Sequence, residues 1–153
     1  MARSMQICVC VMSSAVASRR ARRLLLAEDD ADLRRLIAHS LQKDGAEVVE
    51  IADGTDLRAW AELIARGSHR EFFDAIISDI QMPHTTALDI LGDVPQLLLR
   101  APVILVTAFG TADVCDKAYD LGAAAIVRKP VDPGDLCALV RSVVRAADEP
   151  RIL

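Results

Sequence analysis

Carboxylate side chains end two apolar segments that lie far apart in this sequence. The run Phe73–Asp79 (FDAIISD) ends on Asp79, and the run Leu24–Ala27 (LLLA) is followed directly by Glu28, Asp29 and Asp30. A charge at the end of a buried strand is costly unless it has a partner. Two strands that deliver carboxylates at their carboxyl ends therefore predict a site for a divalent cation, a phosphoryl group, or both.

Two further polar side chains follow later apolar segments. Thr107 comes after Val103–Val106, and Lys129 comes shortly after Ala124–Val127. Carboxylates gathered at one site repel each other unless a cation or a lysine ammonium neutralises them. Ligand sets made only of oxygen favour Mg²⁺ or Mn²⁺. A carboxylate neutralised in this way, beside a lysine and a hydroxyl, predicts phosphoryl transfer to an aspartate nucleophile, Asp79.

Alternating strands and helices are needed to bring these residues together. The third helical segment of the pattern, over residues 86–99, is expected to break near Gly92 or Pro95. Asp132 and Pro133 are expected to begin the last helix. Strands are predicted at residues 24–27, 47–51, 74–78, 103–106 and 124–127, and the other helices at residues 31–43, 55–66 and 112–121.

This alternation predicts an α/β fold in which a doubly wound, five-stranded parallel sheet carries helices on both faces. The expected strand order is 2-1-3-4-5, as in flavodoxin-like folds, and ligands of such sheets bind outside the carboxyl ends of the strands. Residues 47–51 are half polar and are expected near a sheet edge. The helix over residues 31–43 is expected to turn one apolar stripe inward: Leu33, Leu36, Ile37 and Leu41.

Composition limits the class of protein. The 153 residues are 52% apolar but only 3% aromatic, so the core must consist of aliphatic side chains. No apolar run has the roughly 20 residues of a membrane-spanning helix. Four of the 18 basic residues and none of the 22 acidic residues lie in residues 1–22, so the remainder is acidic and not suited to bind nucleic acid by itself. The four cysteines lack zinc-site spacing, and we expect reduced thiols in a cytoplasmic protein.

Three regions are expected along the chain: an N-terminal extension (1–22), one domain (23–147) and a frayed tail (148–153). The apolar stretch Met5–Ala17 superficially resembles a short signal peptide, but the only charge before it is Arg3. We therefore expect a poorly ordered extension, or translation that starts at Met5 or Met12.

Four motifs occur in order at the predicted strand ends: Leu24–Asp30 (LLLAEDD), Ser78–Pro83 (SDIQMP), Val106–Ala108 (VTA) and Arg128–Pro130 (RKP). With these motifs the sequence resembles a response-regulator receiver domain of two-component signalling, from about residue 23 to residue 147. The resemblance implies a metal site in which Asp29 binds Mg²⁺ directly. In that site Glu28 acts mainly through water, and Asp79 and the backbone carbonyl of Gln81 complete the protein ligands.

The resemblance also implies a role for each reacting group. Asp79 would accept a phosphoryl group from a phosphohistidine, on a sensor histidine kinase or a histidine phosphotransfer protein. Thr107 would hydrogen-bond a phosphoryl oxygen, and Lys129 would pair first with Asp79 and then with the phosphoryl group. The Lys129–Pro130 peptide bond is expected to be cis.

The sequence departs from the family pattern at several positions. Ala87 stands where glycine is usual, which is expected to disfavour a turn with positive φ. Ile126 replaces the aromatic residue of the family's switch, so signal output to partner proteins is expected to be weaker or to use a different mechanism. Phe109 and Gln81, at positions that tune attack by water, are both sizeable and predict a slowly hydrolysed acyl phosphate. His84 is the histidine expected nearest the cleft.

The leading hypothesis is a receiver that acts alone, carries a phosphoryl group and contacts a downstream protein target, without binding DNA or a membrane. A receiver-like interaction module that does not use phosphate is an alternative, favoured by Ala87 and Ile126. A phosphatase of the haloacid-dehalogenase type would require a second acid at position 81, where this chain has Gln81. An electron carrier of the flavodoxin type would have to place an FMN phosphate against three acids.

Overall fold

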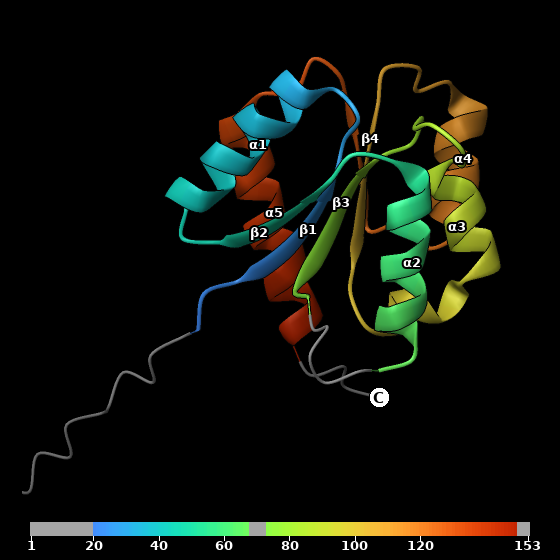
Figure 1. Ribbon diagram of the computed structural model, residues 1–153, viewed down its shortest axis with the longest axis horizontal. Coiled ribbons are helices and arrows are strands. Elements are labelled where there is room, and N and C mark those ends of the chain that lie inside the picture. The colour runs from blue at the N-terminus through green and yellow to red at the C-terminus, as the bar shows by residue number, and fades with distance from the viewer. Residues whose placement is uncertain (1–19, 68–72, 150–153) are drawn as a thin grey trace, which may run out of the picture.

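The computed structural model describes residues 20–67 and 73–149 and shows one five-stranded parallel sheet flanked by helices (Figure 1). The strand order is β2-β1-β3-β4-β5, which confirms the predicted doubly wound, flavodoxin-like fold. In chain order the elements are β1 (Arg23–Ala27), α1 (Ala31–Lys43), β2 (Glu47–Ile51), α2 (Gly54–Ala65), β3 (Ala75–Asp79), α3 (Ala87–Asp93), the 3₁₀ helix η1 (Pro95–Leu99), β4 (Val103–Thr107), α4 (Ala112–Asp120), β5 (Ala125–Arg128) and α5 (Pro133–Asp148).

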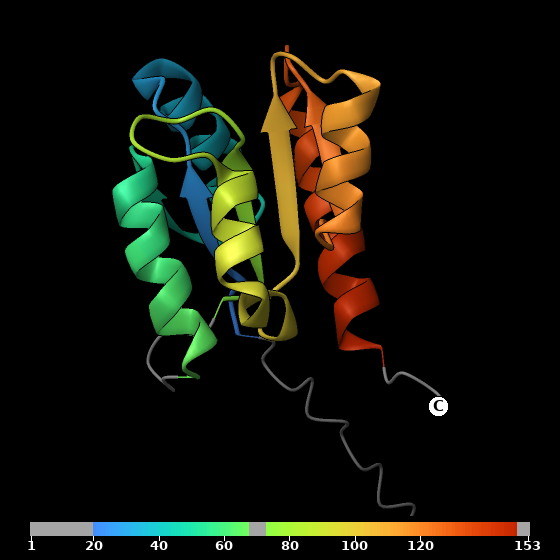
Figure 2. The ribbon, with the colours of Figure 1, turned by 90° about the vertical axis from the view of Figure 1, so that its right-hand side faces the viewer.

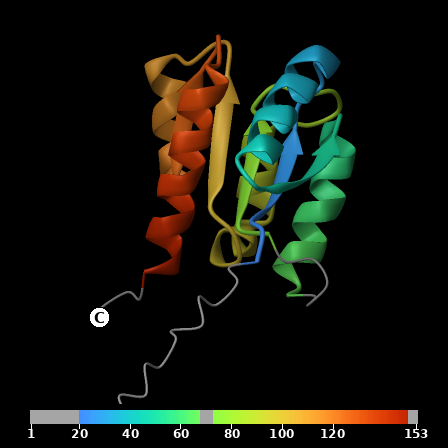
Figure 3. The same cartoon turned by 90° about the vertical axis from the view of Figure 1, so that its left-hand side faces the viewer.

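The helices form one layer on each face of the sheet. α2, α3 and α4 cover one face (Figure 2), and α1 and α5 cover the other (Figure 3). Strands β1, β3 and β4 lie inside the sheet and are buried almost throughout, whereas β2 and β5 form its edges and are partly exposed. The half-polar strand over residues 47–51 therefore lies at an edge, as predicted.

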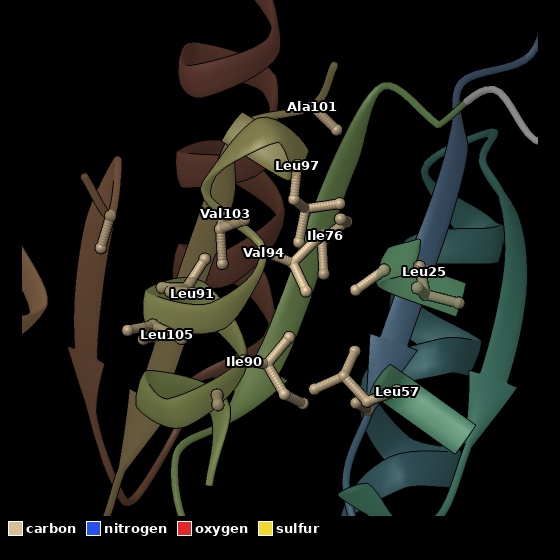
Figure 4. Packing of buried hydrophobic residues seen from close by; sticks show 14 of the residues in the cluster. Leu25, Leu57, Ile76, Ile90, Leu91, Val94, Leu97, Ala101, Val103 and Leu105 are labelled. Atoms are coloured by element: carbon tan, nitrogen blue, oxygen red, sulfur yellow. The ribbon is translucent and has the colours of Figure 1, made fainter. Parts of the chain in front are cut away.

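Alternating residues of the central strands lie on opposite faces of the sheet and belong to two separate hydrophobic cores. On the side of α1 and α5, Leu24 and Ile77 pack with Leu41 and Val140. On the other side, Ile76 and Leu105 pack against α2 and α3. Figure 4 shows this second core, with Leu57 of α2 and Ile90 of α3 facing the space between the two helices. Both cores are almost entirely aliphatic; the one aromatic pair among the described residues is the edge-to-face contact of Trp60 with Phe73.

The predicted helix over residues 86–99 is broken, as expected. α3 ends at Asp93, and Val94 leaves the helical conformation with φ −126° and ψ 62°. A residue before proline is disfavoured in the α region, and Pro95 then begins η1. The break turns the chain so that Leu97 enters the core while Leu99 stays exposed.

One predicted helix stripe was wrong in part. Leu36 of α1 is half exposed, whereas Ile37, Ala38 and Leu41 are buried and Leu33 is partly buried. The inward face of α1 is therefore rotated toward Ala38, because the helix packs against both the sheet and α5.

The chain entering β1 is held by ion pairs. Arg20 contacts Asp74 at 2.9 Å, and Arg22 contacts Asp44 at 2.8 Å. The remaining residues of the predicted extension, 1–19, lie outside the described residues, as do the last residues of the predicted tail.

Cys115 and Cys137 are free thiols in α4 and α5. No helix in the described ranges is long and apolar enough to cross a membrane.

Candidate functional site

The predicted site residues meet at the carboxyl edge of the sheet, toward which the strand arrowheads point in Figure 2. Asp79 is the last residue of β3 and Thr107 is the last residue of β4, its neighbour in the sheet. Glu28 follows β1 directly, and Lys129 follows β5 directly. The strand ladder thus delivers one polar side chain from each of four strands to the same edge.

The carboxylate of Asp79 is buried, and hydrogen bonds hold both of its oxygens. Lys129 Nζ donates to Asp79 Oδ2 at 2.8 Å, and the backbone N–H of Gln81 donates to Oδ1 at 3.1 Å. The strand end itself is fixed because the N–H of Ile80 donates to the carbonyl of Val106. Asp79 therefore has a defined orientation, with only 5% of the residue exposed.

Lys129 bridges two acids. Its Nζ lies 2.8 Å from Asp79 Oδ2 and 3.1 Å from Glu28 Oε2. Burial lowers the pKa of the Lys129 ammonium, but the hydrogen bonds to Asp79 and Glu28 outweigh this effect, and the net pKa is raised. The amino group is thus held charged between the two carboxylates. The Lys129–Pro130 bond is cis, as expected, and the Lys129 N–H donates to the carbonyl of Thr107.

Glu28 and Asp29 occupy different environments although they are adjacent. Glu28 is 1% exposed, and burial raises the pKa of its carboxyl group despite hydrogen bonds from the Asp30 N–H and Lys129. Asp29 is exposed to solvent. One carboxylate oxygen from each of Glu28, Asp29 and Asp79 lies within 4.8 Å of the others.

This donor set fits a small, hard divalent cation. Three carboxylates face one lysine, so the cluster keeps a net negative charge. Its ligand atoms are all oxygen. The exposure of Asp29 leaves one side open for water, which Mg²⁺ usually retains as ligand. Gln81 follows Asp79 closely in the same loop, where its backbone carbonyl was predicted as a further ligand.

The Thr107 hydroxyl is buried and partly engaged. Its Oγ1 accepts a hydrogen bond from the N–H of Phe109 at 3.1 Å, and Thr107 is 2% exposed. Because this bond uses only a lone pair, the hydroxyl proton is left to be donated. The ring of Phe109, by contrast, is 77% exposed.

The loop between β3 and α3 has a residue with positive φ, but this residue is not Ala87. Ala87 is buried as the first residue of α3, and its N–H donates to the carbonyl of Ile80. The positive φ of this loop, 75°, falls on His84 instead. Thr86 caps α3 together with Asp89 in a capping box, so the alanine sits in a helical conformation that suits it.

Two residues that shape the site were not predicted from the sequence. The guanidinium of Arg34, in α1, donates to the backbone carbonyl of Glu28 at 2.7 Å. Gly54 lies against the loop after β3, where its N–H donates to the carbonyl of Pro83. Neither residue carries a local sequence signal, because the Gly54 contact joins segments far apart in the chain and the Arg34 contact depends on how α1 is placed against the end of β1.

Ile126 lies in β5, is half buried, and packs against the core on the side of α2, α3 and α4. The position at which the resemblance places an aromatic switch is therefore filled by an aliphatic side chain. This side chain contributes to the core.

Comparison with known proteins agrees with this geometry. A sequence profile of the response regulator receiver domain matches residues 24–141. The transcriptional regulatory protein PdtaR of Mycobacterium tuberculosis is 34% identical over 124 residues, which covers 80% of this chain and 57% of PdtaR. The response regulator protein PilR of Pseudomonas aeruginosa is 31% identical over 121 residues, which covers 79% of this chain and 26% of PilR. The chain thus spans only part of the length of these relatives.

Solved structures agree as well. A response regulator receiver domain protein from Methanospirillum hungatei superimposes with a TM-score of 0.73 at 25% identity, covering 82% of this chain and 95% of that chain. A receiver domain protein from Clostridium thermocellum gives a TM-score of 0.70 at 27% identity, covering 82% and 96%. With a family profile that spans most of the chain and a matching fold, this protein belongs to the response regulator receiver domain family of two-component signalling.

Proposed function

We propose that Asp79 accepts a phosphoryl group from a phosphohistidine. The observation that carries the proposal is the pairing of a buried, oriented Asp79 carboxylate with Lys129 beside two further acids. An Asp79 oxygen attacks phosphorus and forms the P–O bond of an acyl phosphate. The P–N bond of the donor breaks, and the imidazole nitrogen keeps the electron pair and takes up a proton.

The residues around Asp79 serve this step in separate ways. Glu28, Asp29, Asp79 and the Gln81 carbonyl would hold Mg²⁺ or Mn²⁺, which supplies positive charge next to the phosphoryl oxygens. Lys129 neutralises Asp79 before transfer and pairs with the phosphoryl group afterwards. The free proton of the Thr107 hydroxyl is donated to a phosphoryl oxygen.

The phosphorylated domain would act by changing its contacts with proteins. The donor is a sensor histidine kinase or a histidine phosphotransfer protein, and we place the encounter in the cytoplasm. Because Ile126 has no ring to rotate behind Thr107, we propose that output does not depend on an aromatic switch. The relatives PdtaR and PilR are named a transcriptional regulatory protein and a response regulator protein. For this domain we propose a protein target rather than direct contact with nucleic acid. The domain is then a phosphoryl acceptor with slow autodephosphorylation and not an enzyme.

Phosphorylation of the purified chain tests the proposal. The wild type and Asp79→Asn are each incubated with acetyl phosphate, with MgCl₂ or with EDTA, and intact masses are measured. We expect the mass of one phosphoryl group to be added only to the wild type and only with Mg²⁺. Asp79→Asn removes one of three crowded acids, so it is expected to stay folded.

Three results would contradict the proposal. Wild-type protein that gains no mass with Mg²⁺ and acetyl phosphate would favour a receiver-like module that does not use phosphate. Turnover of a phosphomonoester substrate would favour a phosphatase instead. Equal labelling of Asp79→Asn would place the phosphoryl group on another residue.

A further inference from the structure

Arg34 in α1 contacts the chain where β1 ends. Its Nη1 donates to the backbone carbonyl of Glu28 at 2.7 Å, and its Nε lies 3.6 Å from Glu50 Oε1 on β2. The arginine side chain is only 17% exposed. The Arg34 guanidinium thus connects α1, the edge strand β2 and the backbone at Glu28.

The Glu28 carbonyl needs such a partner. Glu28 is buried and lies one residue beyond the end of β1, where the strand ladder stops. Its N–H still donates to the carbonyl of Ile51. Its own carbonyl accepts from Arg34, and a buried carbonyl left without a donor is strongly unfavourable.

The same carbonyl belongs to the peptide unit that joins Glu28 to Asp29. Its orientation sets the direction in which the Asp29 side chain leaves the backbone. We propose that Arg34 is a positioning residue for the metal site, which fixes this peptide so that Asp29 and Glu28 converge with Asp79. This inference rests on the proposed function, because it concerns binding of Mg²⁺ at those acids.

Positioning and simple electrostatics predict opposite outcomes when Arg34 is removed. Loss of a nearby positive charge, by itself, makes the acidic cluster more negative and strengthens binding of Mg²⁺. Loss of the hydrogen bond frees the peptide and weakens binding, because groups that orient metal ligands contribute strongly to affinity. The sign of the change therefore distinguishes the two effects.

The neighbouring Arg35 provides a matched control. It lies on the same helix, and its side chain is 75% exposed with a 3.9 Å pair to Asp32. Arg34→Met and Arg35→Met change the charge equally. Arg34→Lys keeps the charge but lacks the planar fork that reaches two acceptors.

Calorimetric titration of the full chain with MgCl₂ alone tests the inference, and urea unfolding verifies that each variant is folded. We expect Arg34→Met to weaken Mg²⁺ binding by roughly tenfold. Arg34→Lys is expected to be intermediate and Arg35→Met close to the wild type. Phosphorylation by acetyl phosphate should need more Mg²⁺ in Arg34→Met but reach the wild-type rate at saturation.

An Arg34→Met protein that binds Mg²⁺ as tightly as Arg35→Met, or more tightly, overturns the inference. That holds even if the variant is less stable, since Arg34 would then be structural only. If the wild type neither binds Mg²⁺ nor is phosphorylated, the proposed function fails and this inference fails with it.

Discussion

Both oxygens of the Asp79 carboxylate accept a hydrogen bond before any reaction, and this shapes the chemistry that the group can perform. Lys129 holds Oδ2 and the Gln81 N–H holds Oδ1. A lysine ammonium is a compact charge with three donors on a flexible stem, so it can follow an oxygen that moves. Lys129 can therefore release Asp79 to the phosphorus and remain bonded to the phosphoryl oxygens.

Phe109 gives a prediction about the lifetime of the phosphorylated state. Its N–H bonds Thr107 Oγ1 while its ring stays in solvent. If Thr107 moves to a phosphoryl oxygen, the adjacent ring moves with it and hinders attack by water. We expect Phe109→Ala to shorten the lifetime of the acyl phosphate severalfold, measured by loss of label after removal of the phosphodonor.

Tyr119→Ala serves as the control for this measurement. Tyr119 is also an exposed aromatic residue, but it lies in the last turn of α4. Its removal should leave the lifetime unchanged. A wild-type acyl phosphate that is short-lived, and no shorter in Phe109→Ala, would show that Phe109 does not shield the site.

Among the elements, the loop after β3 is held in place by the start of α2. An ideal Cβ on Gly54 would lie 2.6 Å from both the Thr85 carbonyl oxygen and Thr85 Cγ2. The Gly54 N–H donates to the Pro83 carbonyl at 3.1 Å. No side chain fits between these segments, so glycine is required here by close approach rather than by its backbone angles.

Gly54→Ala should therefore destabilise the fold, although alanine is the better helix former. The added methyl group must push the backbone of Thr85, and overpacking of this kind costs about 1–3 kcal/mol. We expect a lower urea midpoint and weaker Mg²⁺ binding, because the displaced loop also carries Gln81. Urea unfolding followed by circular dichroism, with a calorimetric Mg²⁺ titration, measures both effects.

Gly92→Ala is the matched control in α3. A Cβ at Gly92 would meet only Leu121 Cδ2 at 4.0 Å, an ordinary contact. This variant should be neutral or more stable by up to about 1 kcal/mol. Similar destabilisation of both variants would mean that the close approach at Gly54 is not the cause.

Across the whole molecule, Asp44 ties together segments that are distant in sequence. It caps α1, and it accepts hydrogen bonds from Arg22 at 2.8 Å and from Arg141 of α5 at 2.6 Å. The pKa of the Asp44 carboxyl is lowered, chiefly because the hydrogen bond from Arg141 favours the charged form, with a further contribution from Arg22.

This lowered pKa predicts a pH-dependent part of the stability. The contribution of Asp44 is fully present above its ordinary pKa of 3.8 and is lost as the pH falls through the lower pKa of the folded state. At neutral pH we expect Asp44→Asn to reduce the free energy of unfolding by about 0.5–1 kcal/mol, since the pair is partly exposed. Urea midpoints of both proteins should converge as the pH is taken below that value.

Asp116, an exposed acid, serves as the control for Asp44. Asp116 lies on α4, and the described part of the chain shows no ion pair for it. Asp116→Asn should change the urea midpoint little at neutral pH. A difference between wild type and Asp44→Asn that persists unchanged at low pH would mean that packing, and not the charged network, is responsible.

The sequence by itself determined the order of the elements and the strand ends that carry the chemistry. Apolar runs and helical periodicity are local properties, so β3 ending at Asp79 and β4 ending at Thr107 were readable from residue types alone. The alternation of strands and helices predicted a doubly wound parallel sheet, and the strand order 2-1-3-4-5 was expected by analogy with flavodoxin-like folds. Lys129 could be placed at the same edge because parallel strands share the direction of their ends.

Only the tertiary structure decided how these residues are held. Leu36 is half exposed, although its spacing fits the apolar stripe, because the buried face of α1 is formed by Ile37, Ala38 and Leu41. Gly54 against Thr85 and Asp44 between two arginines join parts that are distant in the chain, and Arg34 reaches the Glu28 carbonyl across the loop between β1 and α1. Such contacts depend on the distances set by packing of whole elements, and no local pattern of residues encodes those distances.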